Sequence, residues 1–291
     1  MLILDGGTGR ELARIGAPFR QPEWSALSLI EAPEYVSRVH QAYVAAGADV
    51  ITTNSYAVVP FHIGHECFSA RGLELARLAG RLAREVADGA GRRVRVAGSL
   101  PPVCGSYRPD LIDLDQARSV LAVLVEALEP HVDHWQAETL SAVAEARLVA
   151  ELVAETAKPL WLSFTLEDEI ADGPARLRSG ESVTGAAEEA RALGAEALLF
   201  NCSQPEVMAA AVRAARLVLG DDARIGVYAN AFPPMTADAE ANSGLDDIRA
   251  DLSPAGYSAF AAAWQAEGAS VIGGCCGIGP EHIAELARLR R

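Results

Sequence analysis

Three cysteines follow segments that the sequence predicts to be β-strands. Cys202 ends an apolar segment that begins at Glu196, and Cys275 and Cys276 end one that begins at Ser270. Thiolates are ligands that zinc and other soft metal ions prefer. Since the chain has five cysteines, an odd number, and two of them are adjacent, a metal site or a reactive thiol fits better than a disulfide framework.

These cysteines can share one ion only under defined geometric conditions. If one strand separates their two strands in a sheet, the strand ends lie roughly 10 Å apart, close enough for inward side chains to meet. Neighbouring strand residues point to opposite faces, so the chain must turn at Cys275 and Cys276. We expect Gly273, Gly274 and Gly277 to supply the backbone freedom for this turn. Three thiolates would leave the fourth zinc position open, as in catalytic sites. Taken singly, each cysteine could instead be an ordinary core residue.

Eight short strand-like segments alternate with longer amphipathic segments along the chain. The predicted strands are 2–5, 49–55, 93–100, 132–139, 159–165, 196–202, 224–230 and 270–276. Between them, apolar residues recur at helical spacing, for example over 73–82 and 143–153. This alternation predicts an α/β protein with a (β/α)₈ TIM barrel in one domain, residues 1–291. A doubly wound open sheet is the alternative.

Helix boundaries are marked by prolines and glycines. Prolines expected in the first turn of a helix are Pro33, Pro205, Pro254 and Pro280, with Ser253 as an N-cap. Glycines expected as left-handed C-terminal caps are Gly47, Gly194 and Gly268.

A barrel of this kind gathers the carboxyl ends of its strands into one active-site rim. The residues expected on that rim are Asp5, Asn54, Ser99, Glu138, Thr165, Cys202, Asn230, Cys275 and Cys276. Asn54 and Tyr56 could bind a substrate or only satisfy their own loop. His62, His65, Cys67 and Cys104 are interpreted as packing or surface residues, although Cys104 follows the third strand and could edge the pocket.

Several motifs together resemble the homocysteine S-methyltransferases. They are Gly-Gly-Cys-Cys-Gly at 273–277, Asn-Cys at 201–202, Asp-Gly-Gly-Thr-Gly at 5–9 and Glu-Thr at 138–139. The similarity runs from end to end of the chain, and the cysteine signature is its specific part. The segment 229–234, Ala-Asn-Ala-Phe-Pro-Pro, departs from the Pro-Asn-Ser-Gly that relatives often carry there.

The resemblance implies a Zn²⁺-dependent barrel that transfers a methyl group to homocysteine and gives methionine, a step of methionine biosynthesis. It implies no catalytic residue beyond the zinc site. Asp5, Gly6 and Gly7 would meet the amino-acid end of the substrate, and Glu138 would bind its ammonium group. Thr139 stands where betaine-specific relatives carry an aromatic residue, so betaine is disfavoured as the donor.

Substrate identity is less restricted by the sequence than the metal is. S-methylmethionine and S-adenosylmethionine are the favoured methyl donors, and homocysteine is the favoured acceptor. Another small thiol or selenol is a second candidate acceptor. A different class altogether is a non-catalytic barrel that binds zinc or a thiol, because a fold does not determine a function.

Composition and charge exclude other classes of protein. The net charge is −14 and Lys and Arg form only short pairs, which argues against nucleic-acid binding. The N-terminal apolar run is too short for a signal peptide, and no later run has the length of a membrane span. We therefore expect a cytoplasmic protein with small-molecule substrates and with neither a nucleic-acid nor a membrane partner. The sequence is compatible with a homo-oligomer and does not determine the oligomeric state.

Overall fold

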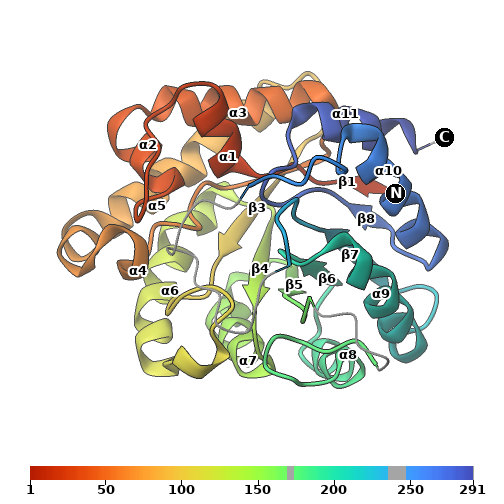
Figure 1. Cartoon of the computed structure of the whole chain (residues 1–291). Coiled ribbons are helices and arrows are strands. Elements are labelled where there is room, and N and C mark those ends of the chain that lie inside the picture. The colour runs from red at the N-terminus through yellow and green to blue at the C-terminus, as the bar shows by residue number, and fades with distance from the viewer. Residues whose placement is uncertain (169–173, 235–246, 291) are drawn as a thin grey trace.

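A closed barrel of parallel strands forms the centre of the molecule (Figure 1). The computed structural model describes residues 1–168, 174–234 and 247–290. Within them the strand order is β1-β8-β7-β6-β5-β4-β3-β2, and β1 and β2 meet through a parallel bridge between Leu4 and Val50. The strands are β1 (Leu2–Ile3), β2 (Val50–Thr52), β3 (Arg95–Leu100), β4 (His134–Leu140), β5 (Leu160–Phe164), β6 (Ala197–Asn201), β7 (Arg224–Tyr228) and β8 (Val271–Ile272). The predicted TIM barrel is confirmed.

Helices surround this barrel (Figure 1). One long helix follows each strand: α3 (Pro33–Ala46), α5 (His65–Asp88), α6 (Leu114–Leu128), α7 (Val143–Val153), α8 (Val183–Ala192), α9 (Pro205–Leu219), α10 (Pro254–Ala266) and α11 (Pro280–Arg288). Shorter helices precede two of them: α1 (Thr8–Arg14), α2 (Ser25–Glu31) and α4 (Pro60–Ile63). Consecutive α/β units therefore build the whole wall, as the sequence pattern predicts.

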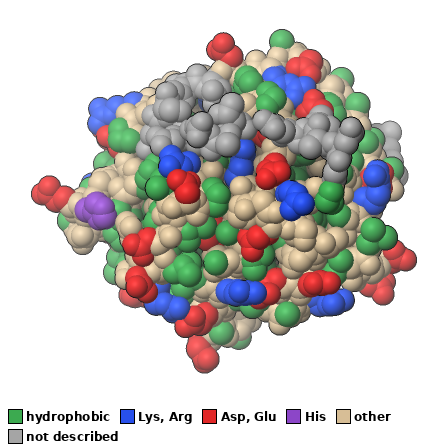
Figure 2. All heavy atoms as spheres, turned by 60° about the horizontal axis from the view of Figure 1, so that its bottom comes forward, with side chains coloured by type: hydrophobic (Ala, Val, Ile, Leu, Met, Phe, Trp, Pro, Cys, Tyr) green, Lys and Arg blue, Asp and Glu red, His purple; other side chains and the backbone are tan. Residues whose placement is uncertain are grey.

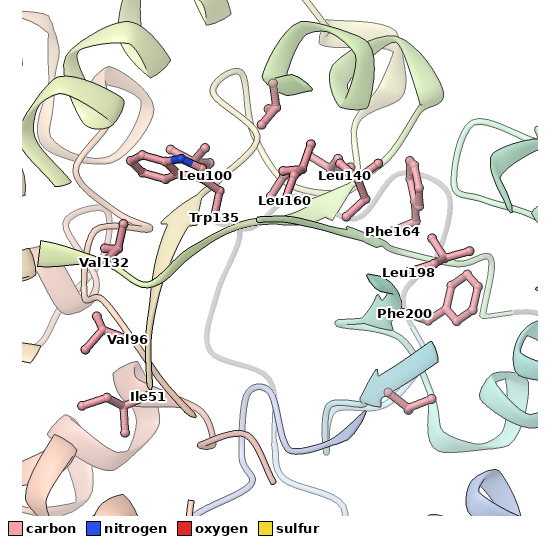
Figure 3. Packing of buried hydrophobic residues seen from close by; sticks show 14 of the residues in the cluster. Ile51, Val96, Leu100, Val132, Trp135, Leu140, Leu160, Phe164, Leu198 and Phe200 are labelled. Atoms are coloured by element: carbon pink, nitrogen blue, oxygen red, sulfur yellow. The ribbon is translucent and has the colours of Figure 1, made fainter. Parts of the chain in front are cut away.

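Alternate residues of each strand pack on opposite sides of the barrel wall. Outward side chains such as Ile51, Leu160 and Leu198 fill the layer between sheet and helices, where Figure 3 places them. Inward neighbours, including Val50 and Trp161, form a separate cluster inside the barrel. This period of two explains why the strands read as continuous apolar runs: both faces are buried.

The predicted helix boundaries agree with the structure. Pro33, Pro205, Pro254 and Pro280 occupy first turns. The Ser253 side chain accepts a hydrogen bond of 3.2 Å from the Gly256 amide. The glycines after three helices have the left-handed φ that such caps require, and they are Gly47, Gly194 and Gly268.

The last predicted strand is wrong in its second half. Residues 270–276 were predicted as one strand, but β8 ends at Ile272, and the turn that we expected at Cys275 and Cys276 follows it. Of the three glycines that we expected to form this turn, only Gly277 has a positive φ, of 83°. A Cβ on Gly273 would collide with Leu4, and one on Gly274 with Ile278. These two glycines are therefore required by close packing, and not by the backbone freedom that we expected of them.

The surface carries charges of both signs. On the face in Figure 2, among the residues drawn in colour, basic and acidic side chains alternate without a continuous basic patch. Among the described residues, charged surface side chains form ion pairs, such as Arg118 with Glu151 and Arg147 with Glu189. Across the described ranges, no helix combines the length and the apolarity needed to cross a membrane.

Candidate metal centre

The three cysteine sulfurs converge at the carboxyl end of the barrel. The sulfurs of Cys202, Cys275 and Cys276 all lie within 4.8 Å of one another. Cys202 directly follows β6 and has a left-handed φ of 51°, so the strand stops there and the side chain is turned into the site. The turn after β8 brings the two adjacent cysteines to the same point. The geometry expected from the sequence, two strand ends and one turn, is present.

The glycine-rich N-terminal segment holds the cysteine turn in place. The Gly7 amide donates to the Ile278 carbonyl at 3.0 Å, and the Gly274 amide donates to the Asp5 carbonyl at 3.0 Å. A Cβ on Gly7 would lie 2.6 Å from the Cys275 carbonyl oxygen. The buried hydroxyl of Tyr43 lies 3.2 Å from the carbonyls of both Gly7 and Ile278. Close contact with the cysteine turn thus explains the glycine at position 7.

The three thiols differ in pKa, and therefore in how readily they ionise. Hydrogen bonds from Cys202 and Cys275 hold the pKa of the Cys276 thiol well below its usual value. Hydrogen bonds with Cys202 and Cys276, together with burial, raise the pKa of Cys275 well above its usual value. Three thiolates this close repel one another, so a bound cation is what would allow all three to ionise.

A cavity of about 170 Å³ opens beside the sulfurs. Its lining comes from the carboxyl ends of the strands and from the loops and short helices that follow them. It includes all three cysteines, Asp5, Gly6, Gly7, Asn54, Glu138 and Thr139. Every residue that the sequence assigned to metal or substrate therefore borders one cavity. Aromatic side chains contribute much of the remaining wall, namely Trp24, Tyr56, Tyr107, Tyr228 and Phe232.

Two buried carboxyl groups border this cavity. Asp5 is 4% exposed and accepts hydrogen bonds from the Thr52 amide at 2.7 Å and hydroxyl at 3.0 Å. Glu138 is 8% exposed and accepts from the hydroxyls of Ser99 and Tyr228. Burial raises the pKa of each carboxyl group to about 7. Each would ionise fully at neutral pH only with a cationic partner.

Asn54 and Thr139 border the cavity while their side chains bond to the protein. The Asn54 amide donates to the Ser25 carbonyl at 3.1 Å. Thr139 has a left-handed φ of 59°, its amide donates to Asn201 Oδ1 at 2.9 Å, and its hydroxyl accepts from Asn201 Nδ2 at 2.8 Å. Asn201 thereby ties the end of β4 to the end of β6, next to Cys202.

Some expected rim residues lie behind the cavity wall. Thr165 contacts the Cys202 carbonyl and the Ser203 hydroxyl, and Asn230 accepts from the Phe232 amide at 3.3 Å. Both stabilise loops and neither is part of the cavity lining. His62, in contrast, is buried and borders the cavity, although its Nδ1 lies 3.0 Å from the Pro22 carbonyl.

Sequence reasoning did not select Arg10, Tyr107 or Phe232 as site residues. Tyr107 forms a hydrogen bond with Cys202. Arg10 borders the cavity from α1 with its guanidinium carbon 5.2 Å from the centre of the Phe232 ring. None of the three lies in a strand, so the expectation that site residues lie at the carboxyl ends of strands could not identify them. Arg10 directly follows the Asp-Gly-Gly-Thr-Gly motif at the start of a helix, and this position could have identified it.

Comparisons with known proteins agree with this geometry. The family model described as homocysteine S-methyltransferase matches residues 2–289. The homocysteine S-methyltransferase of Escherichia coli is 32% identical, with 98% of this chain and 94% of that protein covered. Homocysteine S-methyltransferase 1 of Brassica oleracea is 30% identical, with 98% and 92% covered.

A solved structure extends the likeness to three dimensions. The crystal structure of the homocysteine methyltransferase MmuM from Escherichia coli, in its metallated form, has a TM-score of 0.79 and 29% identity. That match covers 99% of this chain and 96% of the other. From the barrel, the sulfur cluster and these full-length matches, we conclude that the protein is an enzyme of the homocysteine S-methyltransferase family.

Proposed function

We propose that the protein transfers a methyl group from a sulfonium donor to homocysteine, forming methionine, with Zn²⁺ held by Cys202, Cys275 and Cys276. The observation that carries this proposal is the cluster of three sulfurs within 4.8 Å, beside a cavity with two buried carboxyl groups. Membership of the family supports the choice of acceptor. S-methylmethionine and S-adenosylmethionine are the donors that we favour.

The three cysteine sulfurs are suitable ligands for zinc. Three thiolates are a soft ligand set with one coordination position left for a substrate, which is typical of catalytic zinc sites. Bound there, the metal favours the deprotonated, nucleophilic form of the substrate thiol. The metallated state of the Escherichia coli relative supports a metal in this chain.

Asp5 and Glu138 are proposed to bind the homocysteine ammonium group. Their raised pKa values of about 7 mean that a cation is needed to keep both ionised at neutral pH, and an ammonium group supplies it. Gly6 would meet the carboxylate through its backbone amide, whereas the Gly7 amide already donates to the Ile278 carbonyl and would only shape the adjacent wall. Asn54 and Thr139 would complete the substrate contacts from the same cavity wall.

The chemical step needs alignment more than an additional base. The acceptor thiol would release its proton to solvent on binding, and a sulfur lone pair would then form the bond to the methyl carbon. The carbon–sulfur bond of the donor breaks, and its electron pair stays on the donor sulfur, which becomes a neutral thioether. The residues of this chain contribute by fixing the acceptor sulfur in line with that methyl group.

The test measures metal content and methyl transfer in the same variants. We expect about one zinc per wild-type chain and a strong loss of zinc and of methionine formation in Cys202→Ala and Cys275→Ala. Cys67→Ala is the matched control, because Cys67 is a free thiol that does not border the cavity. Zinc at the wild-type level in both site variants would overturn the metal site. No methionine from homocysteine with any sulfonium donor would overturn the reaction, and a thiol panel would then define the acceptor.

A further inference from the structure

One cationic side chain stands in a cavity that is otherwise acidic and aromatic. Arg10 is the only Lys or Arg among the described residues that line it. Its guanidinium carbon lies 5.2 Å from the centre of the Phe232 ring, a stacked cation–π arrangement. The protein as a whole carries a net charge of −14, so a positive charge at this point is a local feature of the site.

The ring that the Arg10 guanidinium faces comes from the loop after β7. Phe232 belongs to residues 229–234, and its position is fixed by several hydrogen bonds. The Ala231 amide donates to the Cys276 carbonyl at 2.8 Å, and the Gln204 side chain donates to the Phe232 carbonyl at 2.5 Å. The aromatic ring is thereby tied to the cysteine turn, and it holds the guanidinium at a defined place.

The charges of the cavity are separated into two poles. Asp5 and Glu138 form an acidic pole, and their negative charges act on each other. Arg10 forms the basic pole, since it lines the same cavity with its guanidinium over the Phe232 ring. The cavity therefore offers separate groups to a cation and to an anion.

Building on the proposed function, we propose that Arg10, held by Phe232, binds a carboxylate of the methyl donor. The acceptor already has its ammonium site at Asp5 and Glu138, and its sulfur belongs at the cysteines. Arg10 and Phe232 line the same cavity and take no part in the acceptor contacts proposed above, which leaves them available to the donor. A planar guanidinium binds a carboxylate with two parallel hydrogen bonds, so the donor class is a sulfonium that carries an amino-acid carboxylate.

The experiment compares S-methylmethionine with its carboxamide, which lacks only the negative charge. We expect the wild-type enzyme to show a KM about 10- to 100-fold higher for the carboxamide, the usual effect of losing a charge-assisted hydrogen bond. In Arg10→Gln, the KM for S-methylmethionine should rise toward that of the carboxamide, while the KM for homocysteine stays constant. Arg14→Gln is the control, since Arg14 lies on the same helix but pairs with Glu11 and does not border the cavity.

Three results would overturn this inference. Equal KM values for the two donors in the wild-type enzyme would exclude a carboxylate site. A rise in the KM for homocysteine in Arg10→Gln would assign Arg10 to the acceptor. Loss of zinc without a change in donor preference would make Arg10 a partner of Cys276 alone. If no variant forms methionine, the proposed function has failed, and calorimetric binding of the two donors still tests the role of Arg10.

Discussion

Glu138 illustrates how one buried side chain is prepared for a charged ligand. It occupies an inward-facing position near the end of β4 and accepts hydrogen bonds from Ser99 and Tyr228, the latter at 3.3 Å. Gln136, two residues earlier, donates to the same Tyr228 hydroxyl at 3.2 Å. These donors favour the charged carboxylate, yet burial outweighs them and raises its pKa to about 7. The carboxyl group is thus oriented, but it ionises fully at neutral pH only when a cation binds beside it.

Replacing Glu138 with Gln should raise the KM for homocysteine by about 10- to 100-fold, because the amide keeps the shape but loses the charge that binds the ammonium group. Steady-state kinetics at fixed donor concentration measure this. Glu145→Gln is the matched control: Glu145 is also buried, with a pKa of about 7, but does not border the cavity. An unchanged KM in Glu138→Gln would remove this residue from the acceptor site.

At the scale of elements, the segment between β1 and α1 packs against the turn between β8 and α11. These segments lie at opposite ends of the sequence, and their backbones interlock through Gly7, Gly274 and Ile278. A side chain at position 7 would push the cysteine turn away from Cys202. The metal site therefore depends on a contact that no single element contains.

Gly7→Ala should weaken zinc binding at least tenfold while most of the fold remains, because the added Cβ would lie 2.6 Å from a backbone oxygen that cannot rotate away. Competition with a chromophoric chelator measures the affinity. Gly89→Ala serves as control, since its Cβ would meet its nearest neighbour at an ordinary 3.4 Å. Equal zinc affinity in both variants would disprove the interlock.

Another element-level feature is the start of α7. Glu145 reaches back to accept hydrogen bonds from the amides of Ser141 at 2.7 Å and Ala142 at 3.1 Å. Burial nevertheless raises its pKa from 4.5 to about 7. The folded chain therefore holds this proton over a pH range in which the unfolded chain has released it. As a result, the contribution of Glu145 to stability falls as the pH rises from about 4.5 to about 7 and then levels off.

Glu145→Gln should remove this pH dependence, because an amide does not titrate. Relative to the variant, the wild-type protein should lose on the order of 2 to 3 kcal/mol of unfolding free energy between about pH 5 and pH 8. Chemical denaturation at both pH values measures the difference. A constant difference between the two proteins would contradict the assignment of the shift to this carboxyl group.

For the molecule as a whole, closure of the barrel separates stability from chemistry. Asp49 precedes β2 at the end opposite the sulfurs, and its Oδ2 accepts from the Ile3 amide at 2.9 Å and from Arg290 at 2.6 Å. These bonds join β1, β2 and the end of the chain. In TIM barrels this face supports stability, whereas the carboxyl ends of the strands carry function.

Asp49→Ala should lower the free energy of unfolding by about 1 to 3 kcal/mol, because the Ile3 amide and Arg290 lose their acceptor. Zinc content and donor preference should not change. Denaturant titration and metal analysis of the same sample measure both quantities. Loss of zinc from a variant that remains folded would contradict the separation of the two faces.

The sequence by itself determined the barrel and most of the residues around the cavity. Strand periodicity and the glycine and proline boundaries defined eight units, and a closed parallel barrel places all strand ends on one rim. Asp5, Glu138 and Cys202 were predictable for that reason, since each follows or ends a strand. The adjacent pair Cys275 and Cys276 was predictable because sharing an ion required a turn.

Only the tertiary structure decided how these residues are supported and which others join them. Thr165 and Asn230 follow the same rule of strand ends but turn into loop contacts. Arg10 reaches the cavity from a helix and Phe232 from a loop. Side-chain periodicity records whether a residue is buried, but not which distant segment it meets. Contacts between segments far apart in the chain depend on packing, and packing exists only once the barrel has closed.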